Sequence, residues 1–334
     1  MRERINSMRL FQKKFTWAIL YGLLLVSFTL YVALDTFVIT RVYSVLPTDE
    51  SGGSLNSSEA GASVNSSGEN TEETSETATE QSNVLQLTES VVVTENSYSD
   101  TNISITITEY REYDTTIYVA DVCVSSAEYL QTAFAHNSFG QNITEKTSVI
   151  AESNNAILAI NGDYYGSQRT GYVLKNGVLF RESASEDQED LVIWPDGSFE
   201  IITEGDISVS HLLENGAIQV LSFGPALVMN GSVSVSESEE VGKAKASNPR
   251  TAIGIVDDLH YLLVVSDGRT DESEGLTLYQ LAEFMQSLGA DIVYNLDGGG
   301  SSTMYFNGEV INNPTTNGNS IKERSVSDIV YIGY

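Results

Sequence analysis

The chain has 334 residues, of which 41% are hydrophobic, and its formal charge at pH 7 is −29. This charge excludes a nucleic-acid-binding protein, because binding a phosphate backbone requires a basic surface. The single cysteine, Cys123, excludes an intramolecular disulfide. The histidines at 136, 211 and 260 lack the spacing of zinc ligands, so we expect neither a zinc enzyme nor a required cofactor. Oxygen-ligated cations stay open, including a structural or catalytic Ca²⁺.

The first 40 residues have the pattern of a membrane anchor. Residues 1–14 contain five Lys or Arg and one Glu, and the twenty residues from Phe15 to Leu34 are uncharged. Twenty apolar residues span a bilayer as a helix, and a basic flank stays on the cytoplasmic side. We therefore expect a cytoplasmic tail at 1–14 and a single transmembrane anchor in the lipid bilayer at 15–40. A cleaved signal peptide is the alternative, but its apolar region is about 7–15 residues and ends at a small-residue site, which this sequence lacks.

Residues 41–95 are rich in Ser, Thr, Glu, Gly and Asn. They offer too few apolar groups to compensate for the entropy of ordering, which predicts a disordered acidic linker. Its role is either to space a folded domain from the membrane or only to connect the two.

A folded domain is expected over 96–334, and it begins with two strands. Residues 103–110 and 115–124 alternate in the strand period of two. In the second strand Ile117, Val119 and Cys123 share one face, so Cys123 is expected to be a buried, small apolar residue. Asn-Gly and Asp-Gly pairs predict turns between further strands, which are expected at 156–160, 171–174, 191–194, 251–256, 261–266, 291–296 and 303–306.

Residues 278–288 predict one clear helix. Thr277 and Gln280 have the spacing of a capping box, and Gly289 supplies a C-terminal stop. An apolar stripe predicts the face that packs on the core: Leu278, Leu281, Met285 and Leu288. With the strands before and after it, this helix makes a β-α-β unit whose two strands are expected to be parallel. The predicted fold is α+β, with a mixed sheet as its core and flanking helices.

Two carboxylates follow the strands of that unit. Asp267 comes after the first strand and Asp297 after the second. Ligands bind beyond the carboxyl ends of strands in such sheets, so both side chains are expected in one crevice. Two carboxyl groups about 5–5.5 Å apart serve a retaining glycosidase, and about 6.5–9.5 Å an inverting one. The sequence leaves both outcomes open.

The glycine run after Asp297 and three arginines predict a phosphate site. Gly298, Gly299 and Gly300 allow backbone amides to converge on an anion, and Ser301 and Ser302 add hydroxyl donors. A plain tight turn is the alternative. Arginine suits bidentate phosphate binding, and three arginines lie beside predicted strand ends or glycine turns: Arg250, Arg269 and Arg324.

A third candidate element runs from Asn161 to Gly166. Asn161 or Asp163 has the chemistry to bind sugar hydroxyls, and Tyr164 or Tyr165 to stack on a sugar ring. An Asn-Gly turn with core tyrosines is the alternative reading of the same residues.

Together these motifs resemble the phosphodiester glycosidase family, which includes bacterial proteins related to exopolysaccharide. The motifs that carry the resemblance come in the family's order over about residues 100–334: NGDYYG, NPRTAIGI, VVSDGR, LTLYQLAEFMQSLGA, NLDGGGSSTMYFNGEVINNP and ERSVSDIVYI. One residue departs from the family pattern, because Asp163 stands where the motif usually has a second glycine.

The resemblance implies a hydrolase that cleaves the glycosidic bond of a sugar-1-phosphodiester, outside the cytoplasm, in cell-surface or wall polysaccharide. It places Asp297 and Asp267 in the site as the catalytic carboxylates. We expect Asp297 to be the essential one, as nucleophile or as base for water, and Asp267 to be second. The residues that the resemblance implies for substrate and phosphate binding are Asn161, Arg250, Arg269, Gly298, Gly299, Ser301 and Ser302, and Arg324 matches an arginine whose role is open. Two alternatives stay: a binder of phosphate-linked glycans without turnover, and a phosphodiesterase that cuts the P–O bond with Asp163, Asp267 and Asp297 as metal ligands.

Overall fold

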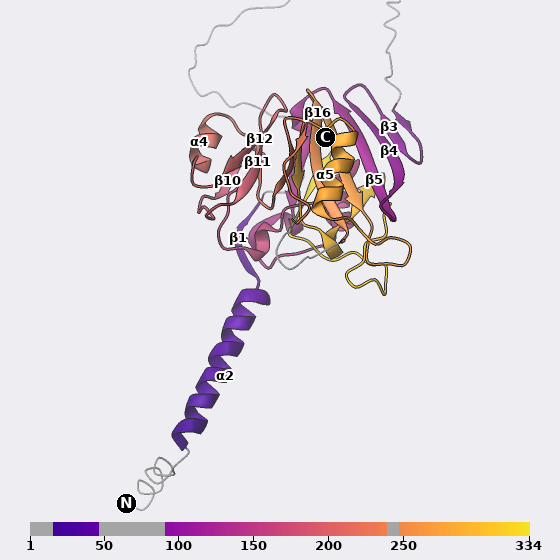
Figure 1. Ribbon diagram of the computed structural model, residues 1–334. Coiled ribbons are helices and arrows are strands. Elements are labelled where there is room, and N and C mark those ends of the chain that lie inside the picture. The colour runs from indigo at the N-terminus through magenta and orange to yellow at the C-terminus, as the bar shows by residue number, and fades with distance from the viewer. Residues whose placement is uncertain (1–15, 47–90, 239–246) are drawn as a thin grey trace, which may run out of the picture.

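The computed structural model describes residues 16–46, 91–238 and 247–334, so the expected tail at 1–14 lies outside the described residues. Helix α2 (Thr16–Phe37) comes first and extends away from the rest of the molecule (Figure 1). Its side chains are exposed, including Trp17 at 70% and Leu24 at 69%. Residues Trp17–Thr36 are long and apolar enough to cross a membrane, a test that a signal sequence also passes.

Strand β1 (Arg41–Val45) follows α2 almost at once and pairs with β7 (Ser138–Gln141). This differs from the expected linker, which was predicted to begin at residue 41. The composition of 41–95 suggested disorder, but the apolar side chains of its first residues find a partner strand 100 residues away in the sequence. Residues 47–90 of the expected linker lie outside the described residues.

The largest sheet has nine strands, and its strand order mixes segments that are far apart in the sequence. Every ladder in it is antiparallel. From one edge to the other its strands are β15 (Ser232–Val233), β14 (Ala226–Met229), β18 (Ile292–Asn295), β16 (Arg250–Asp257), β17 (His260–Ser266), β5 (Thr115–Val124), β4 (Ile103–Glu112), β3 (Ser97–Ser99) and β2 (Val92–Val93).

Two five-stranded sheets complete the β structure. The first consists of β20 (Glu309–Val310), β19 (Met304–Phe306), β8 (Leu158–Asn161), β21 (Asp328–Ile332) and β6 (Leu130–Phe134). The second consists of β10 (Val178–Arg181), β9 (Val173–Lys175), β13 (Gln219–Leu221), β11 (Glu189–Ile193) and β12 (Phe199–Thr203).

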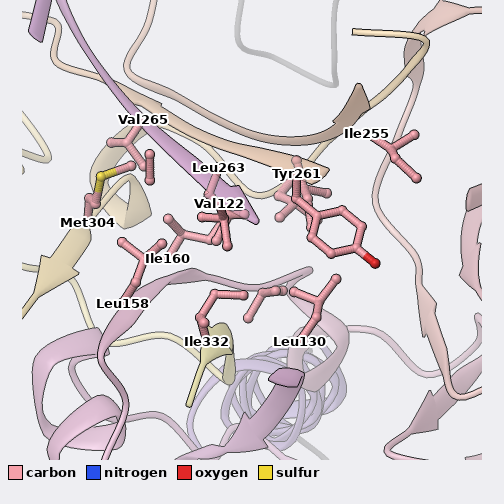
Figure 2. Packing of buried hydrophobic residues seen from close by; sticks show 14 of the residues in the cluster. Val122, Leu130, Leu158, Ile160, Ile255, Tyr261, Leu263, Val265, Met304 and Ile332 are labelled. Atoms are coloured by element: carbon pink, nitrogen blue, oxygen red, sulfur yellow. The ribbon is translucent and has the colours of Figure 1, made fainter. Parts of the chain in front are cut away.

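The main core lies between the nine-stranded sheet and the two smaller ones. Figure 2 shows Leu263 and Val265 of β17 facing Leu158 and Ile160 of β8 across this layer. Helix α5 (Leu278–Ser287) covers the other face of the nine-stranded sheet. Helices α3 (Thr147–Ser153) and α4 (Val209–Glu214) cover the outer faces of the first and second five-stranded sheets. The described domain is therefore α+β, as the sequence predicts.

Helix α5 begins and ends as predicted. Thr277 and Gln280 form both bonds of a capping box, and Leu278, Leu281 and Met285 are buried. Strands β17 and β18, which flank this helix, each pair antiparallel with β16, which lies between them. They are therefore parallel to each other, as expected, without being direct neighbours.

The prediction that Cys123 is buried is wrong, because its side chain is exposed. Ile117 and Val119 lie on the same face of β5 and pack in the core beneath α5. Asp121 and Cys123 lie farther along the strand and are exposed. The alternation identified the correct face of the strand but not how far the helix covers it.

We predict that Leu281→Ala lowers the free energy of unfolding by about 2–5 kcal/mol, because the buried leucine leaves a cavity between α5 and the sheet. Ser287→Ala is the matched control: its exposed side chain lies on the same helix, and we expect a change within about 0.5 kcal/mol. Urea unfolding of the full chain in detergent measures both. Equal midpoints for the two variants would contradict the assigned packing.

Candidate active site

The polar segments that the sequence singles out lie together at one end of the central strands of the nine-stranded sheet. Strand β16 runs opposite to β17 and β18, so it begins where they end. The register pairs Arg250 with Ser266 and Ala252 with Asn295. The segments that start at Arg250, Asp267 and Asp297 therefore lie at the same end of these strands.

A pocket of about 380 Å³ opens at this end of the strands. Its ten lining residues bring charged, amide or aromatic side chains or glycine backbone from six separate segments of the chain. The lining consists of Tyr164, Gln168, Phe223, Asn248, Arg250, Arg269, Asp297, Gly298, Gly299 and Arg324.

Asp297 is the one acidic residue in this lining. Its Oδ2 accepts hydrogen bonds from Ser301 Oγ at 2.6 Å and from Arg324 Nη2 at 2.9 Å. Burial raises the pKa of the Asp297 carboxyl above its ordinary value, and Arg324, Ser301 and the Gly298 amide oppose that rise. The carboxylate is thus desolvated, and specific donors limit the rise of its pKa.

Asp297 is fixed through its backbone as well as its side chain. Its amide donates to the Gly162 carbonyl at 3.2 Å, and its own carbonyl accepts from Asn161 Nδ2 at 2.6 Å. Asn161 and Gly162 are at the end of β8 in the first five-stranded sheet. The two sheets are therefore joined at the residue that presents the carboxylate.

Three guanidinium groups face the same pocket, against one carboxylate. Arg269 Nε and Nη2 donate to Asn248 Oδ1 at 3.1 and 2.9 Å, and Nη1 donates to the Thr316 carbonyl at 2.5 Å. Among the described residues Arg269 forms no ion pair with an acid. Burial, and then the charge of Arg324, lower its pKa. A bound anion would relieve this repulsion between Arg269 and Arg324.

Arg250 is the most buried of the three arginines, with 4% of its surface exposed. Its Nε donates to the Leu276 carbonyl at 2.8 Å, and its backbone amide donates to Ser266 Oγ at 3.0 Å. These bonds hold the guanidinium at the pocket wall, since its position on β16 is already set by the ladder.

The glycine run is required by close packing, which differs from the predicted phosphate cradle. Gly299 has φ +64°, and a Cβ there would lie 2.8 Å from Arg269 Nη2. Its amide donates to the Pro249 carbonyl at 2.8 Å and so is not directed at a ligand. Gly300 is buried against Thr316, where a Cβ would lie 2.5 Å from Oγ1. Only Gly298 and Gly299 line the pocket, and the glycines chiefly let the arginines approach.

Three other predicted binding residues are absent from the pocket lining: Asn161, Ser301 and Ser302. Asn161 is fully buried, and its Oδ1 accepts from Thr251 Oγ1 at 2.8 Å, so it positions Asp297 instead of binding substrate. Ser302 is also fully buried. Ser301 lies beside Asp297 and Arg324, bonded to both. The predicted direct contacts of Asn161 and Ser302 with substrate are therefore corrected.

Asp267 does not share the crevice with Asp297 in the way that the strand ends predict. Its Oδ1 accepts from the Asn313 amide at 2.8 Å and from Asn312 Nδ2 at 3.2 Å, and its Oδ2 accepts from Asn313 Nδ2 at 2.9 Å. Only 4% of its surface is exposed, and it is absent from the pocket lining. This carboxylate holds the segment at 312–313 in place.

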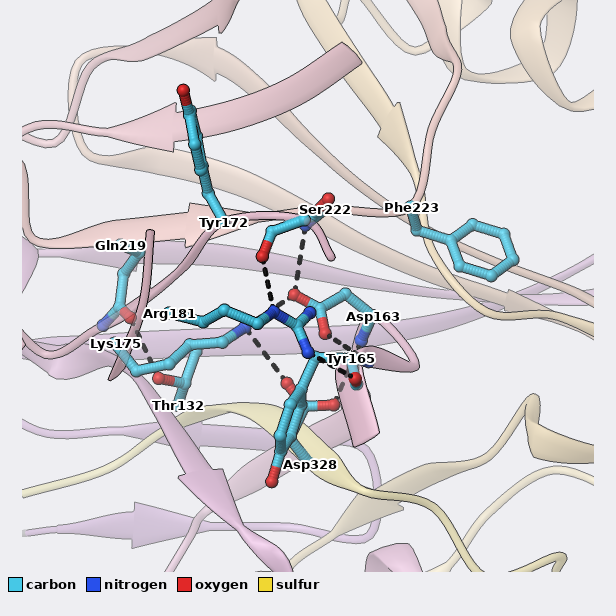
Figure 3. Close-up of polar contacts among 12 residues, drawn as sticks. Thr132, Asp163, Tyr165, Tyr172, Lys175, Arg181, Gln219, Ser222, Phe223 and Asp328 are labelled. Atoms are coloured by element: carbon cyan, nitrogen blue, oxygen red, sulfur yellow. Dashed lines mark hydrogen bonds and ion pairs between the residues drawn. The ribbon is translucent and has the colours of Figure 1, made fainter. Parts of the chain in front are cut away.

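Asp163 is turned away from the pocket into a buried charge cluster, which corrects its predicted contact with sugar. Figure 3 shows Lys175 between two acids, with Nζ 2.7 Å from Asp163 Oδ2 and 3.1 Å from Asp328 Oδ2. Asp163 Oδ2 also accepts from the Ser222 amide at 3.1 Å. The aspartate at the family's glycine position is thus neutralised by a lysine on β9.

Opposite charges hold the three side chains of this cluster together in a buried site. Burial, and then the charge of Asp163, raise the pKa of the Asp328 carboxyl to about 7, while Lys175 opposes the rise. Burial lowers the pKa of Lys175, but the two acids raise it above its ordinary value overall. All three side chains are almost completely buried.

Sequence reasoning missed three residues of the lining: Gln168, Asn248 and Phe223. Phe223 lies in a segment with no recognisable site pattern, and only the fold brings it to the pocket. Of the two tyrosines proposed to stack on sugar, Tyr164 lines the pocket and is 44% exposed. Tyr165 is fully buried and stacks on Phe139, with ring centroids 5.5 Å apart.

The three aspartates that the metal alternative needs are held by separate partners: Lys175, the 312–313 segment and Arg324. Within the described ranges, one group of three His, Cys, Asp or Glu side chains brings its ligand atoms within 4.8 Å of one another: Asp121, Cys123 and His260. That group lies at the opposite end of β5 and β17 from the pocket, since Ser266 pairs with Ile117 and His260 with Cys123.

Comparison with known proteins identifies the family. The family model described as phosphodiester glycosidase matches residues 154–333, more than half of the chain. The chain belongs to the phosphodiester glycosidase family. The family membership that the motifs predict is confirmed.

Two relatives illustrate how far the likeness extends. The SPbeta prophage-derived uncharacterized protein YomE of Bacillus subtilis is 28% identical over 201 residues, which are 59% of this chain and 31% of that protein. The mouse N-acetylglucosamine-1-phosphodiester alpha-N-acetylglucosaminidase is 30% identical over 175 residues, 47% of this chain and 33% of the mouse protein. The chain thus spans about a third of the length of these relatives.

The fold of this chain is similar to that of a solved structure. The catalytic domain of the zebrafish N-acetylglucosamine-1-phosphodiester alpha-N-acetylglucosaminidase superposes with a TM-score of 0.56 at 22% identity. The match covers 70% of this chain and 83% of the zebrafish chain. It supports the α+β fold assigned above.

We predict that Lys175→Met lowers the free energy of unfolding by about 3–5 kcal/mol, because it leaves two buried acids without a cation. The double variant Lys175→Met with Asp163→Asn should recover part of this loss, since it removes one of the uncompensated charges. Urea unfolding at neutral pH measures both variants. If Lys175→Met unfolds at the wild-type urea concentration, the cluster does not stabilise the fold.

Proposed function

We propose that this chain is a hydrolase that cleaves the glycosidic bond of a sugar-1-phosphodiester. The observation that carries the proposal is the pocket whose lining combines Arg250, Arg269 and Arg324 with a single desolvated carboxylate, Asp297. Three guanidinium groups suit a phosphate, and the carboxylate suits an anomeric carbon. The substrates named for the mouse and zebrafish relatives have this same linkage between sugar and phosphate.

The chemistry requires little more than these groups. A phosphate monoester leaves readily, so the reaction needs less help from a general acid than the hydrolysis of an ordinary glycoside. The arginines stabilise the negative charge that develops on the departing phosphate. Asp297 acts on the sugar side of the bond that breaks, either as the nucleophile at the anomeric carbon or as the base that activates water.

The aromatic side of the pocket suits the sugar. Phe223 and Tyr164 line the same cavity as the arginines. Aromatic faces pack against the apolar faces of sugar rings, and Gln168 and Asn248 offer amide groups for hydroxyls. Asp267 takes a positioning role in this proposal, through the 312–313 segment that it holds.

The setting that we propose is the outer surface of a membrane. Helix α2 serves as a single-pass anchor in the lipid bilayer, with residues 1–14 in the cytoplasm and the domain outside. The substrate class is then a phosphate-linked glycan of the cell surface or wall. No cofactor is required for the proposed chemistry, and a bound Ca²⁺ would serve a structural role.

We predict that Asp297→Asn lowers kcat/KM on a sugar-1-phosphodiester by about 10²–10⁴-fold, because it removes the only acidic group in the pocket lining. Asp258→Asn is the control, since this exposed aspartate lies at the far end of β16 and β17. Sugar release by the full chain in detergent measures both. Activity that survives in Asp297→Asn would remove this residue from the mechanism.

Hydrolysis in ¹⁸O-labelled water separates the proposal from its two alternatives. Attack at the anomeric carbon puts the label on the sugar and leaves the phosphate unlabelled, as ³¹P NMR would detect. Label in the phosphate instead means P–O cleavage, and loss of activity in a chelator would add a metal. Tight binding of a phosphate-linked glycan with no product would favour the binding protein.

The pH profile gives a further prediction. Asp297 must be ionised as nucleophile or base, so activity falls as the pH falls through its pKa, which burial raises. Arg324 opposes that rise. Arg324→Gln should therefore move the acid limb of kcat/KM to higher pH, while Arg324→Lys, which keeps the charge, should leave it close to that of the wild type. The same acid limb in both variants would contradict the assigned ion pair.

A further inference from the structure

The end of the apolar helix is tied directly to the folded domain. Only residues 38–40 separate α2 from β1. Strand β1 pairs with β7 over four register positions, from Arg41 with Gln141 to Val45 with Ser138. Gly140 makes this approach possible, because a Cβ at that position would overlap the Arg41 carbonyl oxygen.

Polar contacts also fix the last turn of the helix. Asp35 forms ion pairs with Arg41 and with Arg169, the second at 3.2 Å. Asn142 Nδ2 donates to the carbonyl of Ile39 at 3.0 Å and to that of Thr36 at 3.3 Å. The helix end is thus bonded to both the segment after β7 and the segment that contains Arg169.

Apolar packing completes the connection. The ring of Tyr43 on β1 lies 5.7 Å from that of Phe139, measured between centroids. Leu46 packs against the buried cluster of Phe134, Phe139, Tyr165 and Val173. Backbone pairing, ion pairs and apolar contacts together make this a fixed joint, which is unlike a flexible tether.

The joint lies at the pocket end of the domain. Arg169, which pairs with Asp35, directly follows Gln168, which lines the pocket. Tyr164 of the same segment also lines it. In Figure 1 the orange and yellow loops after β17 and before the C-terminus hang from the lower side of the domain, the side from which α2 descends. The arginines at 269 and 324 belong to these loops.

We propose that this joint holds the pocket mouth at the membrane surface, so that the substrate is a sugar-1-phosphodiester whose alcohol is a lipid in the same bilayer. This inference rests on the function proposed above. In the reaction the bond between the anomeric carbon and the phosphate oxygen breaks, water supplies the new sugar hydroxyl, and the lipid phosphate monoester stays in the membrane.

The charge of the protein agrees with a need for such a joint. At −29, the chain is repelled by the anionic lipids of a bilayer surface, so electrostatics alone would hold the domain away. A short rigid connection instead gives the pocket a high effective concentration of membrane-bound substrate. The positive pocket then meets the lipid phosphate locally, within a few ångströms, where the net charge matters less.

The orientation can be measured without any catalysis. The native Cys123 lies at the end of β5 away from the pocket, roughly 20 Å along the strand from Ile117 at the pocket edge. Asn319 is exposed in the loop that packs on Arg269. We label Cys123 in the wild type, or Asn319→Cys in a Cys123→Ser background, and measure energy transfer to a headgroup dye in proteoliposomes of the full chain.

The expected result is stronger transfer from position 319 than from position 123. Inserting about twelve Gly and Ser residues after Ile39, roughly 40 Å when extended, together with Asp35→Ala and Asn142→Gly, should make the two signals similar. These changes remove the polar contacts of the helix end, so the helix is released while β1 stays docked. Equal transfer from both positions in the chain without the insertion, or stronger transfer from Cys123, would overturn the proposed orientation whatever the enzyme does.

Activity in the same vesicles tests the substrate class. We compare a sugar-1-phosphodiester of a long-chain lipid alcohol, embedded in the bilayer, with the soluble methyl phosphodiester of the same sugar. The insertion with both substitutions should lower the rate on the embedded substrate by about tenfold and leave kcat/KM on the soluble one within about twofold. An unchanged rate on the embedded substrate would overturn the inference and leave the proposed hydrolase intact. No cleavage of either substrate would overturn the proposed function.

Discussion

The hydrogen bonds that join the two sheets at Asp297 are the constraint on which the site depends. Arg250, Arg269 and Asp297 lie at strand ends of the nine-stranded sheet. Asn161 and Gly162 lie at the end of β8 of the facing sheet, and Arg324 precedes β21 of that same facing sheet. Asp297 is bonded to Asn161 and Gly162 through its carbonyl and its amide, so its side chain cannot drift as the sheets move. A carboxylate held to within a fraction of an ångström is what attack at a defined carbon requires.

Charge is distributed in two opposite ways within this domain. The chain as a whole is strongly acidic, yet its pocket contains three arginines and one aspartate. Lys175, which is not part of the pocket lining, lies between two buried acids. Because the protein interior screens charge weakly, the two groups need separate counter-charges. In the pocket Asp297 supplies a counter-charge to Arg324, and a bound phosphate would add another beside Arg269.

Local patterns in the sequence predicted the elements well, and the site only in part. The capping box at Thr277 fixed the start of α5, and the Asn-Gly pairs at 176, 230 and 307 form turns in which both residues have positive φ. The arginines were found because they lie beside strand ends or glycine turns. Phe223 was not, since nothing local marks it, and the exposure of Cys123 depends on where a helix stops covering a strand. The partner of Asp163 lies on another strand, which a motif of eight residues cannot contain.

The docking of β1 also changes what residues 47–90 connect. They leave the domain at Leu46 beside β7 and return at Val91 before β2, the outermost strand of the nine-stranded sheet. Both ends of this segment are thus attached to the same folded body, which makes it a closed loop. A single protease cut between Leu46 and Val91 would therefore leave the two fragments associated through the pairing of β1 with β7.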